Sequence, residues 1–388
     1  MTEFSFAHTA LEDSSEAGTF LGKELKGKLG NQSPDMVLVF SSSRFQPQGL
    51  LAALQASTEA THIVGCTCAG EFIQGAIGTG SISALAIRSD EMRFSIGLGR
   101  NIDRDPEAAI DELISGLTCG GDYAFPFRTL LVLTDALAGQ AQEMIDILNQ
   151  KTGAVYQIFG GGAGDDAKFE STEVFRGCES FSKAVVALEI CSKKPIGIGI
   201  SHGWMPATPP MRVTQASGAR LITLNASPAV EVFRNFAKET GQPFDLENPL
   251  PFFLHNIIGI QTAHGMKLRV PLKLEADGSV VCAAEVPEGA TIRIMSSTEE
   301  STTEAACKAA TTALDGLRGA KPKAAIFFDC VATRLKMGKA FGNELDALSD
   351  ALGHIPYVGC NTYGQIARVD GQFNGFHNCT AVVCVIPE

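Results

Sequence analysis

Residues 62–72 read HIVGCTCAGEF, an apolar run of strand length that enters a turn built from small residues. The same pattern returns at residues 156–166, YQIFGGGAGDD, and at residues 357–367, YVGCNTYGQIA. A further apolar run follows each copy: SALAI, KAVVALEI and NCTAVVCVI. One unit that occurs three times along a chain indicates internal duplication.

Each copy is also preceded by the same kind of sequence. An apolar run comes first, at residues 36–40, 129–134 and 324–329, and is followed by apolar residues at steps of three and four. Such steps bury one face of a helix, whereas uninterrupted apolar runs are typical of strands covered on both sides. We therefore expect an α/β fold with mixed sheets, in which strand, helix, strand, glycine turn and strand repeat.

The length of 388 residues favours two domains. Residues 201–210, SHGWMPATPP, are rich in proline and suit a boundary, and short strand-like runs of antiparallel character follow them. We expect two related domains: residues 1–200 with two repeat units, and residues 201–388 with a diverged section and the third unit. The diverged section is a candidate for a fourth copy, although its residues do not align convincingly.

Composition narrows the class of protein. Hydrophobic residues make up 45% and charged residues 19% of the chain, and the formal net charge is −12. Nucleic acids and anionic membranes bind clustered cations, which this sequence lacks, so we expect neither as a partner. The acidic N-terminus does not resemble a signal peptide, and no stretch reaches the ~20 apolar residues of a membrane span. The sequence predicts a cytoplasmic globular protein.

The eleven cysteines show no C-x-x-C pair and are expected to be small buried hydrophobes in a reducing compartment. Cys66 and Cys68 form a C-x-C whose side chains share one face of a strand. They could bind a soft metal, but two ligands do not complete a tetrahedral site, so packing is the preferred interpretation.

Several strings together resemble the FIST domain proteins: VGCTCAGEF, FGGGAGDD, GISHGW, FFDCVATR and GFHNCT. The resemblance covers about residues 36–200 with the N-terminal FIST segment and most of the rest with its C-terminal partner. It implies intracellular sensing of a small ligand such as an amino acid. Some members of the family carry haem and report nitric oxide to a histidine kinase or a cyclic-dinucleotide enzyme. Because the sequence contains no obvious output domain, the resemblance predicts a separate signalling partner.

One departure from the family concerns the last turn, where Gly364-Gln365 replaces a Gly-Glu pair. A neutral amide can act neither as a base nor as a countercharge to a cationic ligand group. In the first two copies the glycine is followed by an acid, as Gly70-Glu71 and Gly164-Asp165.

Arg334 follows the expected strand that ends in FFDC. An arginine at a strand end can hold a carboxylate through two hydrogen bonds, and the alternative is a structural pair with Asp329. Cys330 beside it is either a reactive thiol or a buried structural cysteine. Glycines such as Gly160 and Gly364 could expose backbone N–H groups to a ligand, or simply permit positive φ or close packing.

Histidines supply the remaining polar candidates, at His202 with Trp204 in SHGW and at His377 with Asn378 in GFHNCT. A neutral imidazole can bind haem iron or a ligand, although most buried histidines are held by a backbone carbonyl. The absence of a C-x-x-C-H string excludes covalent haem and leaves a b-type site as the cofactor to consider.

We predict a small-molecule sensor that binds an amino acid or similar carboxylate in a crevice between or within its domains. The expected ligand-binding residues are His202, Trp204, Arg334, Cys330, Tyr363, Gly364, His377 and Asn378. One alternative is a haem-based nitric-oxide sensor. Another is a cysteine-dependent enzyme that uses Cys330 and His377, although the sequence presents no coherent catalytic set and the sensor is preferred.

Overall fold

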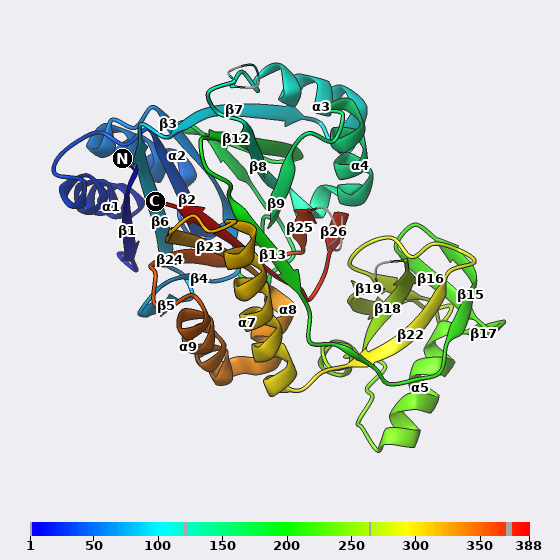
Figure 1. Ribbon diagram of the computed structural model, residues 1–388. Coiled ribbons are helices and arrows are strands. Elements are labelled where there is room, and N and C mark those ends of the chain that lie inside the picture. Colours follow the sequence, from blue (N-terminus) through cyan, green and yellow to red (C-terminus); the bar gives the residue numbers. More distant parts are fainter. Residues whose placement is uncertain (1, 120, 122, 264, 370–374) are drawn as a thin grey trace.

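The computed structural model describes residues 2–119, 121, 123–263, 265–369 and 375–388. It confirms the predicted α/β fold with mixed sheets. Figure 1 shows a larger body that contains three of the four sheets, and a smaller lobe with the fourth sheet. Both chain ends lie on the larger body (Figure 1).

Three segments of the larger body have the same order of elements, and each is called a copy below. Each copy has an edge strand, a helix, a central strand, a second helix, a strand parallel to the central one, a short hairpin and a returning strand. The first copy comprises β1 (Thr2–Thr9), α1 (Ser14–Lys28), β2 (Met36–Ser42), α2 (Pro47–Thr58), β3 (His62–Cys68), β4 (Glu71–Ile73), β5 (Ala76–Gly78) and β6 (Ile82–Ser89).

The other two copies repeat this order, with an additional short helix, α8, in the third. The second comprises β7 (Met92–Arg100), α3 (Pro106–Ser115), β8 (Phe127–Thr134), α4 (Ala141–Lys151), β9 (Gln157–Gly162), β10 (Val174–Arg176), β11 (Glu179–Phe181) and β12 (Ala184–Ser192). The third comprises β13 (Gly197–Ser201), α7 (Glu299–Gly316), β23 (Pro322–Cys330), α8 (Val331–Met337), α9 (Phe341–Ala351), β24 (Tyr357–Thr362), β25 (Gln365–Arg368), β26 (Gly375–His377) and β27 (Ala381–Pro387).

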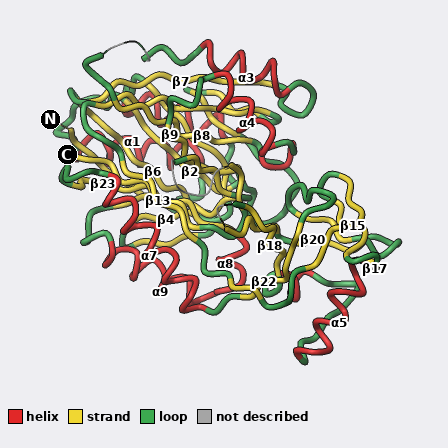
Figure 2. The backbone as a smooth tube through the Cα atoms, turned by 45° about the vertical axis from the view of Figure 1, so that its right-hand side comes forward, coloured by secondary structure: helices red, strands yellow, loops and turns green. Residues whose placement is uncertain are grey.

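The three sheets surround one apolar core. Their inner faces form a single cluster, in which the Phe328 ring lies 5.4 Å from Phe40 and 6.1 Å from Phe159. The outer faces are covered by helix pairs, α1 with α2, α3 with α4, and α7 with α9. Figure 2 shows the last two of these pairs on the outside of the strands. The central strands are uninterrupted apolar runs because both of their faces are buried.

The short hairpins are exchanged between copies. The β4–β5 hairpin of the first copy pairs with β24 of the third, and β10–β11 of the second pairs with β3 of the first. The β25–β26 hairpin of the third copy pairs with β9 of the second. Each sheet therefore contains strands from two copies, and the three copies are interleaved in a ring.

A glycine in each parallel strand fixes the alignment of the copies. A Cβ atom at Gly65, Gly160 or Gly359 would lie 2.0, 1.9 or 2.3 Å from a carbonyl oxygen of the neighbouring central strand. Equivalent hydrogen bonds then join the turns in a ring: Ala69 N to Asn361 O, Gly164 N to Thr67 O, and Tyr363 N to Gly162 O, each 2.9 Å.

This alignment differs by one residue from the sequence pattern in the second copy. Gly164, not Asp165, takes the place of Ala69 and Tyr363 in the ring of hydrogen bonds. The residue equivalent to Glu71 and Gln365 is therefore Asp166, and Asp165 has a different role.

The smaller lobe is inserted into the third copy, between β13 and α7 (Figure 1). It comprises β14 (Met205–Pro206), β15 (Met211–Ser217), β16 (Arg220–Leu224), β17 (Ser227–Pro228), α5 (Ala229–Thr240), α6 (Leu250–Phe253), β18 (Ile257–Thr262), β19 (Gly265–Arg269), β20 (Pro271–Leu274), β21 (Val280–Cys282) and β22 (Thr291–Ser296). Every strand pair among its described residues is antiparallel, so this section is not a fourth copy.

The two ends of the insertion lie side by side, since Ser301 Oγ donates a 2.7 Å hydrogen bond to Gly203 O. The lobe has an apolar core of its own and meets the body through a second cluster that includes Trp204, Met295 and Cys330. The boundary expected at residue 200 falls within β13, which pairs with β27 at the edge of the third sheet.

Candidate functional site

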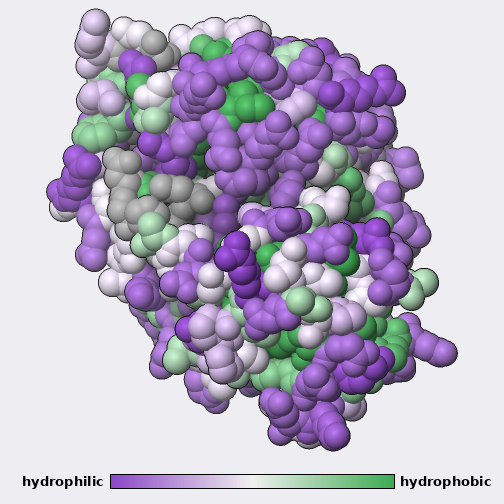
Figure 3. Space-filling view, turned by 90° about the vertical axis from the view of Figure 1, so that its right-hand side faces the viewer, coloured by the Kyte–Doolittle hydropathy of each residue, from purple (hydrophilic) through white to green (hydrophobic). Residues whose placement is uncertain are grey.

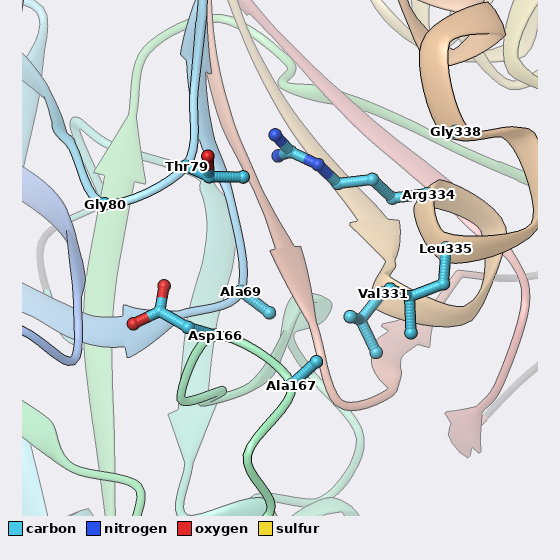
Figure 4. Close-up of a pocket in the computed structure, with 9 residues that line it drawn as sticks. All are labelled: Ala69, Thr79, Gly80, Asp166, Ala167, Val331, Arg334, Leu335 and Gly338. Atoms are coloured by element: carbon cyan, nitrogen blue, oxygen red, sulfur yellow. The ribbon is translucent and has the colours of Figure 1, made fainter.

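The segments that follow the parallel strands of the three copies enclose a pocket of about 460 Å³. Figure 4 shows the residues that line it. They are Ala69, Thr79 and Gly80 from the first copy, Asp166 and Ala167 from the second, and Val331, Arg334, Leu335 and Gly338 from the third. All three copies thus contribute to one site at the ends of their strands, where α/β sheets commonly bind ligands.

Arg334 is the cation of this pocket. Its side chain extends from α8 towards Thr79 (Figure 4). Nη1 donates to Asn361 Oδ1 and Nη2 donates to Gly78 O, each at 2.8 Å. No ion pair within 4 Å joins Arg334 to a carboxylate among the residues that the structure describes. The expected structural alternative, a direct pair with Asp329, is replaced by a contact through Asn361, whose Nδ2 lies 3.4 Å from Asp329 Oδ2.

Partial burial lowers the pKa of Arg334, while the acidic groups Glu71, Cys68, Asp329 and Asp166 act in the opposite direction. The guanidinium remains charged, because an arginine pKa lies far above neutrality. Gly70 makes room for it: a Cβ atom there would lie 1.7 Å from Nη1. The glycine of the first turn therefore serves the close approach of Arg334.

Asp166 lies on the opposite wall of the pocket (Figure 4). Its Oδ2 accepts hydrogen bonds from Ser42 Oγ at 2.8 Å, Ser43 N at 3.1 Å and Ser43 Oγ at 2.7 Å. These contacts tie the second copy to the first. They also leave Arg334 as the stronger candidate for a charged ligand group.

A second pocket, apolar and much smaller at about 40 Å³, adjoins the first. Val331 and Leu335 of α8 line both pockets. The inserted lobe supplies one wall of the second pocket, and the body supplies the other. The lobe residues are Leu250, Leu254, Val270, Leu272 and Ala283, and the remaining body residues are Phe169, Cys330, Ala332, Tyr363 and Asn378.

Three of the predicted site residues meet in the second pocket, namely Cys330, Tyr363 and Asn378. The buried Asn378 Oδ1 accepts no hydrogen bond from any described residue. The Tyr363 ring stacks on Phe169 at 4.5 Å, and its hydroxyl donates to Asp165. Asp165 in turn accepts from the backbone of Phe169 and of residues 170 and 171, so it shapes the loop that forms this wall.

Cys330 is 3% exposed. A hydrogen bond with the Cys379 side chain, supported by backbone N–H groups, lowers the pKa of Cys330 to about 7 against the effect of burial. The partner with the largest effect on this pKa is therefore a second thiol. His377 is not among the residues that line this pocket. The geometry gives no support to a catalytic pair of Cys330 and His377.

The two predicted histidines lie outside both pockets. His202 Nε2 lies 3.2 Å from Met266 O, and its Nδ1 accepts a hydrogen bond from Trp204 N at 3.3 Å. The Trp204 ring packs at the contact between lobe and body, 4.6 Å from Lys336 Nζ. His377 is buried, and burial together with Lys267, Arg269 and His202 keeps its pKa well below the ordinary value.

Gly364 and Gln365 brace their own turn. A Cβ atom at Gly364 would lie 2.1 Å from the Phe376 ring, so close packing explains this glycine. Gln365 Nε2 donates to Thr362 Oγ1 at 2.9 Å, and its Oε1 accepts from Thr380 N at 3.2 Å. Neither residue lines the two pockets.

Glu71 makes the corresponding contacts in the first copy. Its Oε2 accepts from Ser81 N at 3.0 Å and Ser81 Oγ at 2.8 Å, and its Oε1 accepts from Cys68 Sγ at 3.2 Å. Burial raises the pKa of Glu71 to about 7. The Glu-to-Gln departure of the last turn therefore affects a buried structural position in this protein.

The structure thus divides the predicted site residues into three sets. Arg334 lines the larger pocket, Cys330, Tyr363 and Asn378 line the smaller one, and His202, Trp204, Gly364 and His377 line neither. The sequence did not point to Thr79, to Asp166 or to the apolar wall from the lobe. Only Asp166 had a local signal, as the second acid of GGGAGDD.

Comparison with known proteins gives two family matches. The FIST N domain matches residues 35–227, and the FIST C domain matches residues 229–368.

This chain belongs to the FIST family.

The resemblance predicted from the sequence is confirmed, and FIST domains are associated with small-ligand sensing in signal transduction. Two uncharacterised Mycobacterium tuberculosis proteins, from strains CDC 1551 / Oshkosh and ATCC 25618 / H37Rv, are 23% identical to the FIST chain. Each match covers 96% of this chain and 95% of the relative. None of the helices in the described ranges has the length and apolar character required to cross a membrane.

Solved structures show only weak likeness to the FIST chain. A cyanuric acid hydrolase from A. caulinodans shares 7% identity over 100% of both chains, with a TM-score of 0.33. The T. maritima PurL protein complexed with FGAR shares 12% identity over 99% of this chain and 72% of its own, with a TM-score of 0.25. At these TM-scores neither likeness carries an argument about the FIST chain.

Proposed function

We propose that this FIST protein senses a small carboxylate, an amino acid or a similar molecule, in the two adjoining pockets along α8. The observation that carries the proposal is the Arg334 guanidinium, which lines the larger pocket without an ion-pair partner among the described residues. A planar guanidinium recognises a carboxylate through paired hydrogen bonds.

The smaller pocket extends this proposal to the rest of the ligand. Its walls are almost entirely apolar, and Asn378 Oδ1 is a buried acceptor that a ligand N–H or O–H group would satisfy. A pocket of about 40 Å³ accommodates little more than one small group without adjustment. We infer that a small apolar side chain enters it and that the lobe moves outward slightly as the ligand binds.

Signalling follows from the position of the pockets. Because the lobe forms one wall and the body the other, a ligand that fills both stabilises one arrangement of lobe and body. We propose that a separate cytoplasmic partner, such as a histidine kinase or a cyclic-dinucleotide enzyme, reads this arrangement. On the face in Figure 3 the described residues are mostly hydrophilic, with apolar ones in small groups, which favours a ligand-controlled contact over a permanent one.

The experiment is a thermal-unfolding screen of the purified chain with amino acids, dicarboxylates and the matching amines that lack the carboxylate. A ligand at 100 times its Kd stabilises the folded state by about 2.7 kcal/mol, which raises the Tm measurably. We expect the carboxylates of one class to raise the Tm and their decarboxylated analogues to have no effect.

Arg334→Lys tests the site, because lysine keeps the charge and lacks the planar pair of donors. We expect this variant to lose the response, while Arg234→Gln retains it, since Arg234 forms only an exposed ion pair with Glu231 on α5. A screen without any stabilising carboxylate, or an equal response from both variants, would contradict the proposal.

The haem alternative has less support from the geometry, since both ring nitrogens of His202 already face hydrogen-bond partners. Adding haemin to the purified chain tests it directly: a Soret band that shifts with nitric oxide would favour the haem sensor over the carboxylate sensor.

A further inference from the structure

A buried carboxylate stands between two thiols in the second copy. Glu189 on β12 is 0% exposed, and Cys191 follows two residues later on the same face of the strand. Cys119 lies after α3, on the segment that leads to β8. One ligand atom from each of these residues lies within 4.8 Å of the other two, and this is the only such group among the described residues.

The shared frame of the three copies does not require this carboxylate. Glu189 pairs with Leu130 on the central strand of the second copy. Leu130 lies two residues before Val132, the residue opposite the glycine that aligns the copies. The equivalent residues on the returning strands are Ala86, which pairs with Val37, and Val385, which pairs with Ala325. An apolar side chain therefore suffices at this position in the other copies, and a buried carboxylate is costly unless it is compensated.

Hydrogen bonds hold Glu189 in one orientation. Its Oε2 accepts from Ser95 Oγ at 2.6 Å and from Cys119 N at 2.8 Å, and its Oε1 accepts from Tyr156 Oη at 2.6 Å. The fourth contact is weak, a 3.7 Å approach of Cys191 Sγ to Oε1. Oriented carboxylates with donors behind them are typical of metal ligands, whose partners fix the geometry.

We propose that Cys119, Glu189 and Cys191 bind a zinc ion, with a water molecule as the fourth ligand.

The residue types suit this ion. Two thiolates and one carboxylate are ligands of the borderline-soft Zn²⁺, which prefers a tetrahedral arrangement. Binding releases two thiol protons and replaces the contacts that these protons make, among them the weak approach of Cys191 Sγ to Oε1.

The ion can reach this site from solvent. Cys119 is only partly buried, and Ser95 and Thr118 line a polar pocket of about 740 Å³. Thr118 N donates to Ser95 Oγ, so the hydroxyl that holds Glu189 also faces this pocket. The site lies away from the Arg334 pocket and shares no lining residue with it.

The experiment adds Zn²⁺ to the reduced 388-residue chain that carries Cys178→Ser, which removes an exposed thiol. A chromophoric chelator in competition gives the stoichiometry and affinity. Co²⁺ in place of Zn²⁺ gives thiolate-to-metal charge-transfer bands and tetrahedral visible bands, a readout of the ligands themselves. We expect one equivalent of either metal.

Variants test one of the ligands and the hydrogen bond that supports another. Cys119→Ser, the mildest change because this residue is partly exposed, should remove the charge-transfer band in part and weaken Zn²⁺ binding by at least tenfold. Tyr156→Phe removes only a donor to Glu189, and changes of this kind weaken metal binding by roughly 10–100-fold. Cys384→Ser, a buried cysteine on β27, is the matched control and should leave binding unchanged.

The proposal is overturned if the reduced chain takes up less than one equivalent of Zn²⁺, or if Cys119→Ser and Cys384→Ser have equal effects. A chain that binds no zinc but forms a Cys119–Cys191 disulfide with hydrogen peroxide would assign the two thiols to redox chemistry instead.

Discussion

Glu71 and Gln365 occupy the same buried position in two copies. Their hydrogen-bond partners explain why one copy has a glutamate and the other a glutamine. Each side chain accepts a hydrogen bond from a backbone N–H, of Ser81 or Thr380. On the other side Glu71 accepts from the Cys68 thiol, whereas Gln365 donates to the Thr362 hydroxyl. The second copy places Asp166 at this position and directs it towards Ser42 and Ser43 instead.

Glu71→Gln should change how stability depends on pH. The pKa of Glu71 is raised from 4.5 to about 7, chiefly by burial. Between these values the folded chain binds more protons than the unfolded chain, so stability is greatest below pH 4.5 and decreases up to about pH 7. The full effect is roughly 3 kcal/mol, at about 1.4 kcal/mol for each pKa unit. Glutamine cannot titrate, so thermal unfolding of Glu71→Gln should lose this part of the slope.

Gln365→Glu is the matched reverse change, and we expect it to add a slope of the same sign. Glu344 is also buried, with a pKa raised to about 8 by burial, so some pH dependence persists in both variants. Identical slopes for the wild type and Glu71→Gln would show that Glu71 is ionised in the folded chain at neutral pH.

At the scale of elements, the exchanged hairpins hold the three copies together. The β4 strand places Phe72 among Phe327, Phe341 and Tyr357 of the third copy, with ring centroids 5.8, 5.7 and 6.5 Å away. Phe72 is fully buried, whereas Ile77 on the paired strand β5 is 47% exposed. The hairpin therefore offers two substitution sites: Phe72, which packs in the third copy, and the more exposed Ile77, which serves as a control.

Phe72→Ala should destabilise the whole body. Large-to-small changes of a buried phenylalanine cost about 3–5 kcal/mol, because the removed ring leaves a cavity. We expect chemical denaturation to show this loss in a single transition, while Ile77→Ala changes stability by about 0.5 kcal/mol or less. Loss of the first copy alone, with the third copy still folded, would contradict the idea that the hairpins couple the copies.

The elements that the sequence predicted are those with local signals. Apolar runs predicted β2, β8 and β23, and helical steps predicted α2, α4 and α9, because neighbouring residues determine which faces of these elements are buried. Helix α8, which carries Arg334, was not predicted. The exchange of hairpins was not predicted, since β4 pairs with β24, far along the chain, and its three residues carry no mark of that partner.

The site was predicted in part for the same reason. The sequence pointed to Arg334 and Cys330 at the end of an expected strand, to Tyr363 in a turn and to Asn378 in GFHNCT, and all four line one of the two pockets. The lobe wall, with Leu250 and Leu272, was missed because ordinary apolar residues give no sign of which surface they face. The second copy was misaligned by one residue because Gly164 and Gly70 look alike in sequence, and only the hydrogen bonds of their turns distinguish them.

At the scale of the whole molecule, the lobe is an addition to a complete three-copy body. Its ends lie together where Ser301 Oγ meets Gly203 O, and it has a core of its own around Phe233, Ile258 and Ile292. The body core contains residues of all three copies and none from the lobe. The body can therefore fold around its own core, and the lobe supplies one wall of the smaller pocket.

Replacing residues 205–297 by a short glycine–serine linker should therefore leave a folded body. We expect circular dichroism to show cooperative unfolding at a lower Tm, because Trp204 and Cys330 lose the apolar cover of Met295 and Leu268. The same chain should lose stabilisation by carboxylates with apolar side chains, since Leu250 and Leu272 no longer close the smaller pocket. Carboxylates without a side chain should keep a weak, Arg334-dependent effect. If the chain without residues 205–297 does not fold, although the isolated lobe does, the body would need the lobe in order to fold, and the prediction would be wrong.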